Sequence, residues 1–451
     1  MTAGSEPDSG AMERDARQVN VRDTRVAPGE IAIGVVIGRT SEFFDFFVYA
    51  IASVLVFPVY VFPYVDRLTG TMYSFGLFAL AFVARPVGTL IFMAVDRLYG
   101  RATKLTIALF LLGCSTVAVA FLPGYESIGI WSAILLGVFR IGQGLALGGA
   151  WDGLASLLSL NAPENRRGWY AMIPQLGAPL GLIVASALFA YFVSSLSAVD
   201  FLDWGWRYPF FCAFTINVVA LFARLRLVST PDFTKLFESR DLQPTPVVKT
   251  LEKEGRNVII GAFAPLASFA LFHMVTVFPL SWIFLFTDEV PSRFLIIEAV
   301  AAFFGLGAIV LSGHLADRVG RRTLLAISAA AIAAFSGFAP QLLDAGDVGE
   351  IIFMVGGFII LGISFGQCSG VVASNFPRSE RYTGAALTSD IAWLFGAGFA
   401  PLAALLLASH WGILAAGGYL LSGALATLVA LWISKTLGQE ERPETVQPQP
   451  A

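Results

Sequence analysis

Long blocks of apolar residues, separated by short polar segments, make up most of the chain from residue 31 onward. The blocks are continuous rather than periodic, as in 31–57, 105–122 and 351–361, so they lack the single apolar stripe of an amphipathic surface helix. Most of them reach the roughly 20 residues that an α-helix needs to cross the hydrocarbon core of a bilayer. The pattern predicts an all-α protein that crosses a membrane many times.

We count twelve predicted membrane spans. They lie at 31–57, 71–94, 104–122, 130–159, 168–195, 207–228, 257–287, 293–313, 323–342, 349–373, 383–408 and 411–435. A single long polar stretch, 229–256, falls between them and divides them into six and six. The expected domains are a polar tail at 1–30, a six-helix bundle at 31–228, the central loop at 229–256, a second bundle at 257–436 and a tail at 437–451.

Composition supports a membrane protein and excludes several other classes. Hydrophobic residues make up 56% of the 451 positions and charged residues only 14%, whereas soluble chains carry about 25% charged residues. The net charge of −3 argues against a nucleic-acid partner. Three isolated cysteines and three scattered histidines predict no disulfide framework, no metal site and no cofactor. The polar tail lacks the apolar core of a cleaved signal peptide, so we expect the first span to direct insertion.

The lysines and arginines predict how the chain is oriented. If both termini are cytoplasmic, 23 of the 29 basic residues fall in cytoplasmic tails and loops and three fall in outer loops. Basic residues accumulate on the cytoplasmic side of membrane proteins. We therefore expect a multi-pass protein of the bacterial inner membrane, with both termini in the cytoplasm and the lipid bilayer around it.

The two halves of the chain resemble each other in sequence. An Asp-Arg pair followed by Gly-Arg occurs after the second span of each half, at 96–101 and 317–322. Gly320 follows Gly100 by 220 positions, and Pro401 follows Pro179 by 222, within Ala-Pro-Leu in both copies. Parallel six-helix repeats of this kind support alternating access, in which a central site opens to one side of the membrane at a time.

Two of these motifs resemble those of the major facilitator superfamily. Gly313-His-Leu-Ala-Asp317-Arg-Val-Gly320-Arg-Arg322 resembles its loop motif, and Arg140-Ile-Gly-Gln143-Gly144 with Gly148 resembles its fourth-helix motif. In the loop motif, glycine allows a tight turn and an aspartate faces arginines and a helix N-terminus, which can form a contact that breaks and re-forms. The latch residues that we predict on the cytoplasmic side are Asp96, Arg97, Gly100, Arg101, Asp152, Asp317, Arg318, Gly320, Arg321 and Arg322.

The first-half loop departs from this pattern, because two residues rather than one separate Arg97 from Gly100. We therefore expect the first-half latch to matter less than the second. Asp152 is expected to pair with Arg97 or Arg101 as a gate rather than to couple protons directly.

Further motifs narrow the resemblance to the metabolite:H⁺ symporter branch of this superfamily, which includes shikimate, proline/betaine, citrate, α-ketoglutarate and dicarboxylate carriers. They are Glu42-Phe-Phe-Asp45, Ala84-Arg85-Pro86, Pro174-Gln-Leu-Gly-Ala-Pro179, Trp204-Gly-Trp-Arg207 and Arg224-Leu-Arg226. One position departs from the branch. Its usual Gly-Gly-Glu-Trp in the fourth helix is Gly148-Gly149-Ala150-Trp151 here, and Asp152 is rotated by about 200° from the missing glutamate.

The charged residues that stand out inside predicted spans are Arg39, Glu42, Asp45, Arg85, Arg140 and Asp390. Each would cost about 2.5–3.5 kcal/mol at the bilayer centre if it were unpaired, so we expect them to be paired or to line a wet cavity. On the first helix, Arg39, Glu42, Asp45 and Tyr49 share one broad face. The two acids are close enough for one to hold a proton, which predicts a proton-coupling site at Glu42 and Asp45 with Arg140 as its partner. A static Arg39–Glu42 pair and a permanent structural role for Arg140 are the alternatives.

A second set of polar or aromatic residues is expected to line the substrate path. The candidates are Arg39, Tyr49, Arg85, Gln143, His273, Gln367, Asn375, Asp390 and Trp393. His273 is equally compatible with an interior histidine whose hydrogen bonds are satisfied.

The expected function is secondary active transport: proton-coupled symport of a small polar metabolite, most consistent with an organic acid, by a monomer. A uniporter, exchanger or exporter of the same fold is the main alternative. The sequence has no Walker A motif and none of the nucleophile or metal-ligand motifs of membrane enzymes. A channel is disfavoured by the duplicated halves with their latch loops.

Overall fold

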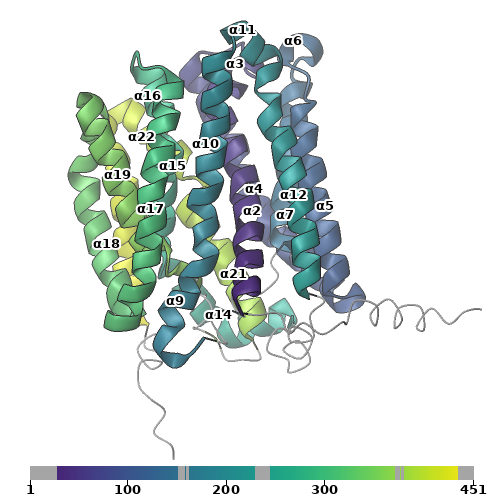
Figure 1. The fold of residues 1–451 in the computed structure, drawn as a ribbon, viewed down its shortest axis with the longest axis vertical. Coiled ribbons are helices and arrows are strands. Elements are labelled where there is room, and N and C mark those ends of the chain that lie inside the picture. Colours follow the sequence, from purple (N-terminus) through teal and green to yellow (C-terminus); the bar gives the residue numbers. More distant parts are fainter. Residues whose placement is uncertain are drawn as a thin grey trace, which may run out of the picture.

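The computed structural model describes residues 28–150, 158, 162–228, 244–370, 376 and 380–434, and in these ranges the regular structure is helical (Figure 1). The long helices run side by side and form a bundle. Their lengths follow from uninterrupted apolar sequence, which favours helices because a backbone in lipid must satisfy its own hydrogen bonds.

The first half contributes six long segments. They are α2 (Pro28–Leu55), α4 (Arg67–Tyr99), α5 (Arg101–Ala120), α7 (Trp131–Gly149), α9 (Arg167–Met172) continued by α10 (Gly177–Ser195), and α12 (Arg207–Val228). Short helices connect them at one end of the bundle: α3 (Phe57–Tyr60), α6 (Tyr125–Ile128) and α11 (Ala198–Asp200).

The second half is more often interrupted. Its helices are α14 (Val247–Phe263), α15 (Leu266–Thr276), α16 (Phe278–Phe286), α17 (Pro291–Val319), α18 (Arg321–Phe338), α19 (Gly346–Phe365), α21 (Arg381–Trp393), α22 (Ala400–Trp411) and α23 (Ala416–Ile433). The breaks beside α15 fall at Pro265 and next to Pro279, because proline cannot donate the backbone hydrogen bond of a helix interior. Helix α14 begins ten residues before the predicted span at 257–287, inside the stretch predicted to be loop. Residues 229–243 of that stretch lie outside the described part of the chain.

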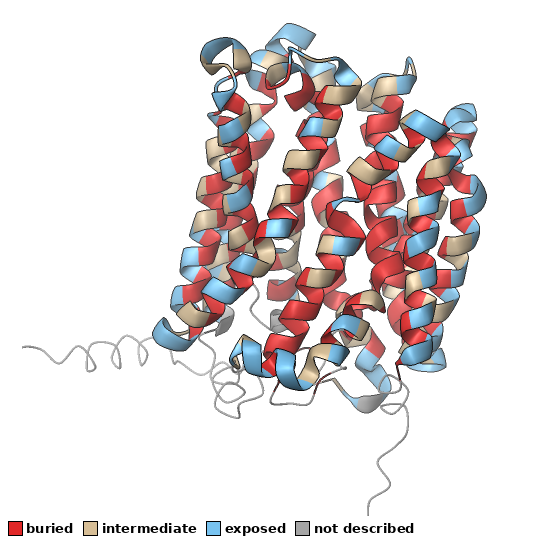
Figure 2. Cartoon of the chain, turned by 180° about the vertical axis from the view of Figure 1, so that it is seen from behind, coloured by how far each residue is buried: buried red, intermediate tan, exposed pale blue. Residues whose placement is uncertain are grey.

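The predicted number of spans is confirmed. From Arg67 onward, 11 helical segments of the described chain are long and apolar enough to cross a membrane. Helix α2, with 28 residues, is the twelfth. Large apolar side chains such as Phe110, Phe222 and Phe303 are exposed on the outside of the bundle, while the inward faces are buried (Figure 2). Exposed apolar surface of this extent fits a lipid environment rather than water.

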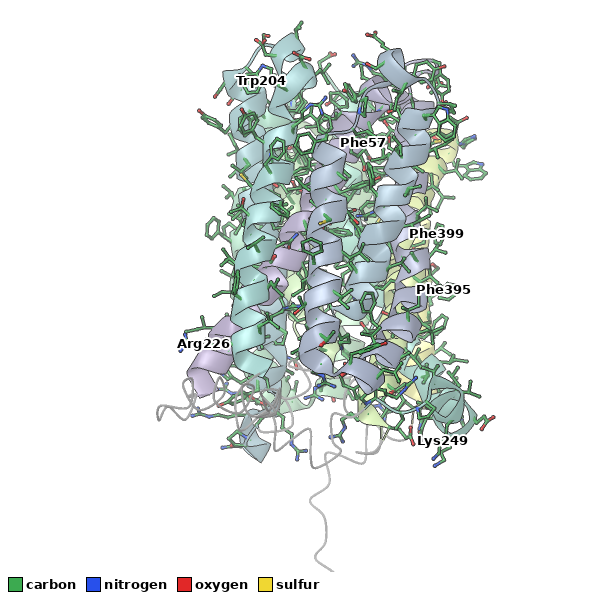
Figure 3. The ribbon with its side chains drawn as sticks, turned by 90° about the vertical axis from the view of Figure 1, so that its right-hand side faces the viewer. Phe57, Trp204, Arg226, Lys249, Phe395 and Phe399 are labelled. Atoms are coloured by element: carbon green, nitrogen blue, oxygen red, sulfur yellow. The ribbon has the colours of Figure 1, made fainter. Side chains whose placement is uncertain are left out.

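The two ends of the bundle differ. We call the end that carries the turns at Gly100 and Gly320 the motif end; α9, α14 and α21 lie there (Figure 1). Both glycines have positive φ, 81° and 84°, a conformation that other residues adopt only with strain. Arg226 and Lys249 also lie at the motif end, whereas Phe57 and Trp204 lie at the opposite end (Figure 3).

The Trp204-Gly-Trp-Arg207 motif has a structural role at the opposite end. Arg207 donates hydrogen bonds to the carbonyl oxygens of Ala120 (2.5 Å) and Leu122 (3.3 Å) and to the hydroxyl of Tyr60 (2.7 Å). It therefore satisfies carbonyls that the end of α5 leaves without helical partners. This motif ties helices of the first half together.

The glycines of the fourth-helix motif set the distance between α4 and α7. A Cβ atom on Gly144 would lie 2.3 Å from the Ala81 carbonyl oxygen, and one on Gly148 would lie 2.4 Å from that of Arg85. Small residues let transmembrane helices pack this closely. The close packing of these helices determines where Arg85 of α4 and Arg140 of α7 lie relative to each other.

Candidate proton and substrate site

Aromatic rings from both halves meet at the centre of the bundle. The first half contributes rings from α2 (Phe43, Phe46 and Phe47) and from α4 (Phe78 and Phe82). They face rings of the second half from α15 (Phe272 and His273), α19 (Phe365) and α21 (Trp393). We call these nine residues the aromatic cluster. Ring centroids lie 5.2 Å apart for Phe46 and His273 and 6.1 Å apart for Phe82 and Trp393. All nine residues are buried. The predicted candidates His273 and Trp393 thus lie together at the contact between the halves.

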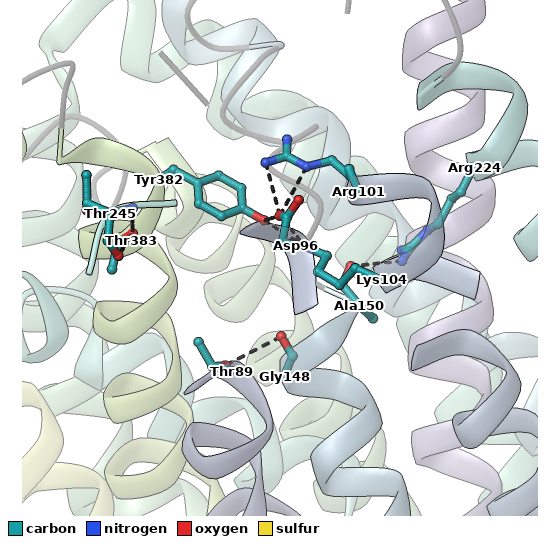
Figure 4. Close-up of polar contacts among 10 residues, drawn as sticks. All are labelled: Thr89, Asp96, Arg101, Lys104, Gly148, Ala150, Arg224, Thr245, Tyr382 and Thr383. Atoms are coloured by element: carbon teal, nitrogen blue, oxygen red, sulfur yellow. Dashed lines mark hydrogen bonds and ion pairs between the residues drawn. The ribbon is translucent and has the colours of Figure 1, made fainter. Parts of the chain in front are cut away.

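Glu42 is held between two arginines. It forms ion pairs with Arg39, one turn earlier on α2, and with Nη2 of Arg224 on α12 at 2.5 Å. Arg224 is buried and also donates to the carbonyl oxygen of Ala150 at 3.2 Å (Figure 4). Arg224 was counted among the 23 basic residues of the predicted cytoplasmic segments, and that placement is wrong: its side chain is buried in the bundle and pairs with an acid. The static Arg39–Glu42 pair, one of the two alternatives, is present.

Asp45, one turn further along α2, has no such partner. Its side chain is buried and accepts hydrogen bonds on Oδ1 from the Thr116 hydroxyl (2.5 Å) and from the Asn217 amide (3.5 Å). Among the residues that the structure describes, no lysine or arginine lies within ion-pair distance of it. Glu42 and Asp45 therefore have separate sets of partners and do not form the single pair that their spacing suggested.

A chain of hydrogen bonds connects Asp45 to Arg140. Arg140 Nη1 donates to Gln143 Oε1 (3.0 Å), Gln143 Nε2 donates to the Thr116 hydroxyl (2.8 Å), and that hydroxyl donates to Asp45. Arg140 also donates to the Phe78 carbonyl oxygen (3.1 Å). The predicted partnership of Arg140 with this acid is thus indirect, through two neutral groups, and Arg140 forms no ion pair with Glu42 in the described structure.

Arg85 and Asp390 pair across the two halves. Arg85 Nε lies 2.8 Å from Asp390 Oδ1, and Thr89 of α4 donates to Asp390 Oδ2 at 2.5 Å. The Arg85 guanidinium also lies 5.9 Å from the Trp393 ring centroid. Both residues were predicted to contact substrate. In this conformation they contact each other, so they can reach a ligand only if the halves separate.

The remaining predicted lining residues are divided between two regions. Gln143 is part of the hydrogen-bond chain to Asp45, and Tyr49 packs its ring 4.1 Å from the Arg140 guanidinium. Gln367 lies at the motif end, where it donates to the carbonyl oxygen of Gly168 (3.3 Å) and to the Ser312 hydroxyl (3.2 Å). Its predicted place on the substrate path is therefore not found in this conformation. Asn375 lies outside the described residues.

The second-half latch holds the two halves together at the motif end. Asp317 accepts hydrogen bonds from the backbone N–H groups of Gly168 (2.6 Å) and Trp169 (3.1 Å), at the start of α9 in the first half. A carboxylate at a helix N-terminus is stabilised by the helix dipole and by the free N–H groups. The predicted contact of Asp317 with a helix N-terminus is present.

The arginines around Asp317 have other partners. Arg321 and Arg322 donate to the carbonyl oxygens of Gly370 (3.0 Å) and Leu431 (2.7 Å), within the second half. Arg318 is exposed. The arginines of the motif therefore brace the second half, while the aspartate makes the contact between halves.

The first-half loop also reaches across to the second half (Figure 4). Buried Asp96 lies 3.3 Å from Arg101 Nη2 and 3.4 Å from Lys104 Nζ, and it accepts a hydrogen bond from the Tyr382 hydroxyl of α21 at 3.4 Å. Lys104 donates to the same hydroxyl at 2.8 Å. Arg97 is exposed, and Asp152, its predicted partner, lies outside the described residues. The altered loop still forms a contact between halves, through Tyr382.

Sequence reasoning missed several residues of this network: Thr116, Asn217, Arg224, Lys104, Tyr382 and Glu298. Glu298 falls near the outer end of the predicted span 293–313, where an interfacial position would be expected, but its side chain is fully buried and accepts a hydrogen bond from Ser186 of the other half at 2.9 Å. Arg224 could have been recognised, because it falls inside the predicted span 207–228. Thr116 and Asn217 are ordinary residues of apolar helices and carry no signal of their own.

The model of the family described as "Major Facilitator Superfamily" matches residues 41–393. The chain belongs to the major facilitator superfamily. It is 36% identical over 411 residues to an Escherichia coli protein named "Inner membrane metabolite transport protein YhjE", with 90% of this chain and 93% of that protein covered.

More distant members of the superfamily have names that state substrates. The chain is 29% identical to a protein of Escherichia coli named "Shikimate transporter", with 90% of this chain and 94% of that protein covered. It is 27% identical to the same organism's "Proline/betaine transporter", with 87% and 80% covered. A crystal structure of a D-xylose-proton symporter superposes with a TM-score of 0.68 at 17% identity, covering 91% of this chain and 98% of that one. The major facilitator fold and the role of the chain as a membrane transporter rather than an enzyme follow.

Proposed function

We propose that this transporter is a proton-coupled symporter of a small organic acid, and that Asp45 carries the coupled proton. The observation that supports it is the setting of Asp45: a buried carboxyl group with hydrogen bonds but no ion pair in the described structure, connected to a buried arginine through Gln143 and Thr116. An uncompensated charge at this depth costs about 2.5–3.5 kcal/mol, so this closed state favours the neutral, protonated acid.

Release of the proton requires a change in the same network. When Asp45 becomes charged, the guanidinium of Arg140 is the buried cation connected to it, and breaking the Gln143 bridge would allow direct pairing. Arg140 is then withdrawn from the substrate. Proton release and substrate release are coupled because both depend on the position of one arginine.

The charges around the centre support an anionic substrate. Four buried or half-buried arginines, Arg39, Arg85, Arg140 and Arg224, face three acids, Glu42, Asp45 and Asp390. With Asp45 protonated, two ionised acids remain, which leaves a surplus of two positive charges. A buried surplus is costly unless an anion enters, and arginine is well shaped to bind a carboxylate. Two relatives are named as transporters of shikimate and of proline and betaine. Each of these molecules carries a carboxylate, which agrees with this proposal.

The contacts at the motif end fit a gate. We infer that this end faces the cytoplasm of a bacterial inner membrane, with both termini on that side, because the sequence assigns 22 of the 29 basic residues (the predicted 23 without Arg224) to cytoplasmic tails and loops, which include the turns at Gly100 and Gly320. Asp317 and Tyr382 then close the path to the cytoplasm, and both contacts break when bundles 31–228 and 257–436 rock apart. The two bundles form one complete path, so a monomer is sufficient for transport.

Uptake into proteoliposomes tests this function. A thermal-shift screen of organic acids and betaines on the purified protein supplies the ligand to be radiolabelled. One proton carried with a monocarboxylate anion moves no net charge, so the pH gradient is the driving force: one pH unit is worth about 1.4 kcal/mol per proton, which corresponds to roughly tenfold accumulation. We expect accumulation that an imposed pH gradient drives and a protonophore abolishes. Uptake that equilibrates the ligand but ignores both would show a uniporter or exchanger instead.

A further inference from the structure

Three buried polar side chains in or beside the aromatic cluster have nitrogen or oxygen atoms without hydrogen-bond partners among the described residues. Nη2 of Arg140, the hydroxyl of Tyr49 and both ring nitrogens of His273 have none. They come from α7, α2 and α15, and therefore from both halves of the bundle. Buried polar groups are nearly always hydrogen-bonded. The hydrogen-bond chain from Arg140 to Asp45 does not explain why three side chains in one place leave buried polar atoms unpaired.

The three groups surround the same rings. The Arg140 guanidinium lies 4.1 Å from the centroid of the Tyr49 ring and 4.8 Å from that of Phe78. The His273 ring lies 5.5 Å from Phe78 and 5.2 Å from Phe46, centroid to centroid. Arg140 and His273 are thus separated by the thickness of one or two rings. Movement of Phe46 or Phe78 would let all three groups reach one ligand.

The chemistry of the three groups selects an anion. A guanidinium only donates hydrogen bonds, a phenol donates one, and a neutral imidazole donates one from either nitrogen. A carboxylate offers only acceptors, enough for all three donors, and its hydrogen bonds to arginine are the strong, charge-assisted kind. An ammonium group could use only the Tyr49 oxygen and one nitrogen of His273 as acceptors, and it would be repelled by the positive charge of Arg140.

A small apolar hollow lies next to this trio, and it gains room for a ring only after the side chains around it move. Phe47, Phe272 and Phe365 of the aromatic cluster line part of it. The rest of the lining comes from α10, α15, α17 and α19, with Thr276 as its one polar residue. The Phe46 ring lies 5.2 Å from Phe47, which lines the hollow, and 5.9 Å from the Arg140 guanidinium. Phe46 is therefore close to both the donors and the lining of the hollow. Apolar hollows of this kind stay dry and accept apolar groups.

We propose that the substrate is a monocarboxylate with an apolar, ring-sized body. Its carboxylate binds Arg140, Tyr49 and His273, and its body occupies the apolar hollow after Phe46 turns aside. This inference rests on the proposed transport of an organic acid and specifies its class. A second carboxylate or several hydroxyl groups would lose their water in a lining that offers almost no hydrogen bonds.

A quaternary ammonium body fits less well, although aromatic rings can bind cations. The rings that could bind it already face the protein's own cations: Arg39 lies over Phe43 at 4.9 Å, Arg85 over Trp393 at 5.9 Å and Arg140 over Phe78 at 4.8 Å. A cationic body would therefore be repelled by three nearby positive charges. This separates the proposal from a betaine.

Calorimetric titration of the purified full-length protein tests it. The probes are benzoate, phenylacetate and cyclohexanecarboxylate, with succinate and glycine betaine for comparison. We expect the three ring acids to bind at least tenfold more tightly than the other two. Arg140→Gln should weaken their binding at least tenfold and Tyr49→Phe several-fold. Arg67→Gln, which changes an exposed arginine at the opposite end, should leave binding unchanged.

A second variant tests the hollow without touching the donors. Leu182→Phe narrows the lining and should weaken binding of phenylacetate more than that of the smaller benzoate, while the unliganded melting temperature confirms that the variant folds. Equal loss for the two acids, or ring acids that bind the Arg140→Gln variant as tightly as the native protein, would overturn the proposal. Proton-driven uptake of succinate or betaine with no binding of ring acids would overturn it while leaving the proposed function intact. Tight binding of ring acids whose transport ignores the pH gradient would overturn the proposed function and support the substrate class.

Discussion

Glu42 and Asp45 lie one helical turn apart on α2, yet their surroundings differ. Glu42 is fixed by arginines on both sides, from its own helix and from α12. Asp45 has a hydroxyl and an amide as partners and is connected to Arg140 only through neutral groups. The difference teaches that depth in the membrane does not by itself make an acid a proton carrier. An acid with two cations is kept ionised, whereas one without can exchange its proton as the network rearranges.

The largest effect is expected for Asp45→Asn. This change removes the titratable group and keeps its size, so accumulation driven by a gradient of one pH unit should fall from roughly tenfold to none. Native uptake should accelerate as the outside pH falls, because the acid must be protonated to load, and the variant should lose that dependence. Counterflow exchange of labelled ligand, which needs no proton, should survive in the variant and serves as its control. Normal accumulation by the variant would move the coupling site to His273 or Asp390.

Glu42→Gln should damage stability more than coupling. The variant leaves Arg39 and Arg224 facing each other without their shared acid, and breaking a buried ion pair costs about 3–5 kcal/mol. We expect a lower melting temperature in detergent, with uptake still driven by the pH gradient. The double variant Glu42→Gln/Arg39→Gln removes one of the two cations and should recover part of the loss. A stable Glu42→Gln protein that no longer couples would reverse the roles of the two acids.

Asp317→Ala should slow turnover about tenfold with a small change in the apparent affinity for substrate. The aspartate bonds to two N–H groups of α9 only while the motif end is closed, so its loss shifts the balance between conformations rather than the binding site. Initial rates over a range of ligand concentrations separate the two parameters. An unchanged maximal rate would remove Asp317 from the gate.

Tyr382→Phe should have the smallest effect, a two- to threefold change in rate. The hydroxyl accepts from Lys104 at 2.8 Å but donates to Asp96 only at 3.4 Å, and Asp96 retains Arg101 and Lys104 within the first half. The same rate assay, run beside Asp317→Ala, ranks the two latches. A larger loss in the tyrosine variant would contradict the expectation that the first-half latch matters less.

The fold could be predicted from the sequence because membrane spans depend on length and apolarity, which are local properties. The acids Glu42 and Asp45 and the latch glycines Gly100 and Gly320 could be identified from the sequence for a similar reason. A charge inside an apolar run, and a glycine that follows an Asp-Arg pair, stand out along the chain. The partners could not. Whether Glu42 meets Arg224 or Arg140 depends on how α2 and α12 are rotated against each other, and no periodicity encodes that. Gln367, predicted on the substrate path, lies at the motif end in this conformation, and its distance from the centre depends on where α19 ends, which the apolar run does not specify.

The central claim is that Asp45 carries the coupled proton and Glu42 does not, and substrate-driven proton movement tests it most directly. Proteoliposomes that contain a pH-sensitive dye and hold no pH gradient are given the ligand, and the lumenal pH is followed for the native protein, Asp45→Asn and Glu42→Gln. The account predicts that the native protein acidifies the lumen, and that the folded fraction of Glu42→Gln does so as well. Asp45→Asn should cause no acidification, although it still catalyses counterflow. Acidification by Asp45→Asn at the native ratio of protons to ligand would contradict it.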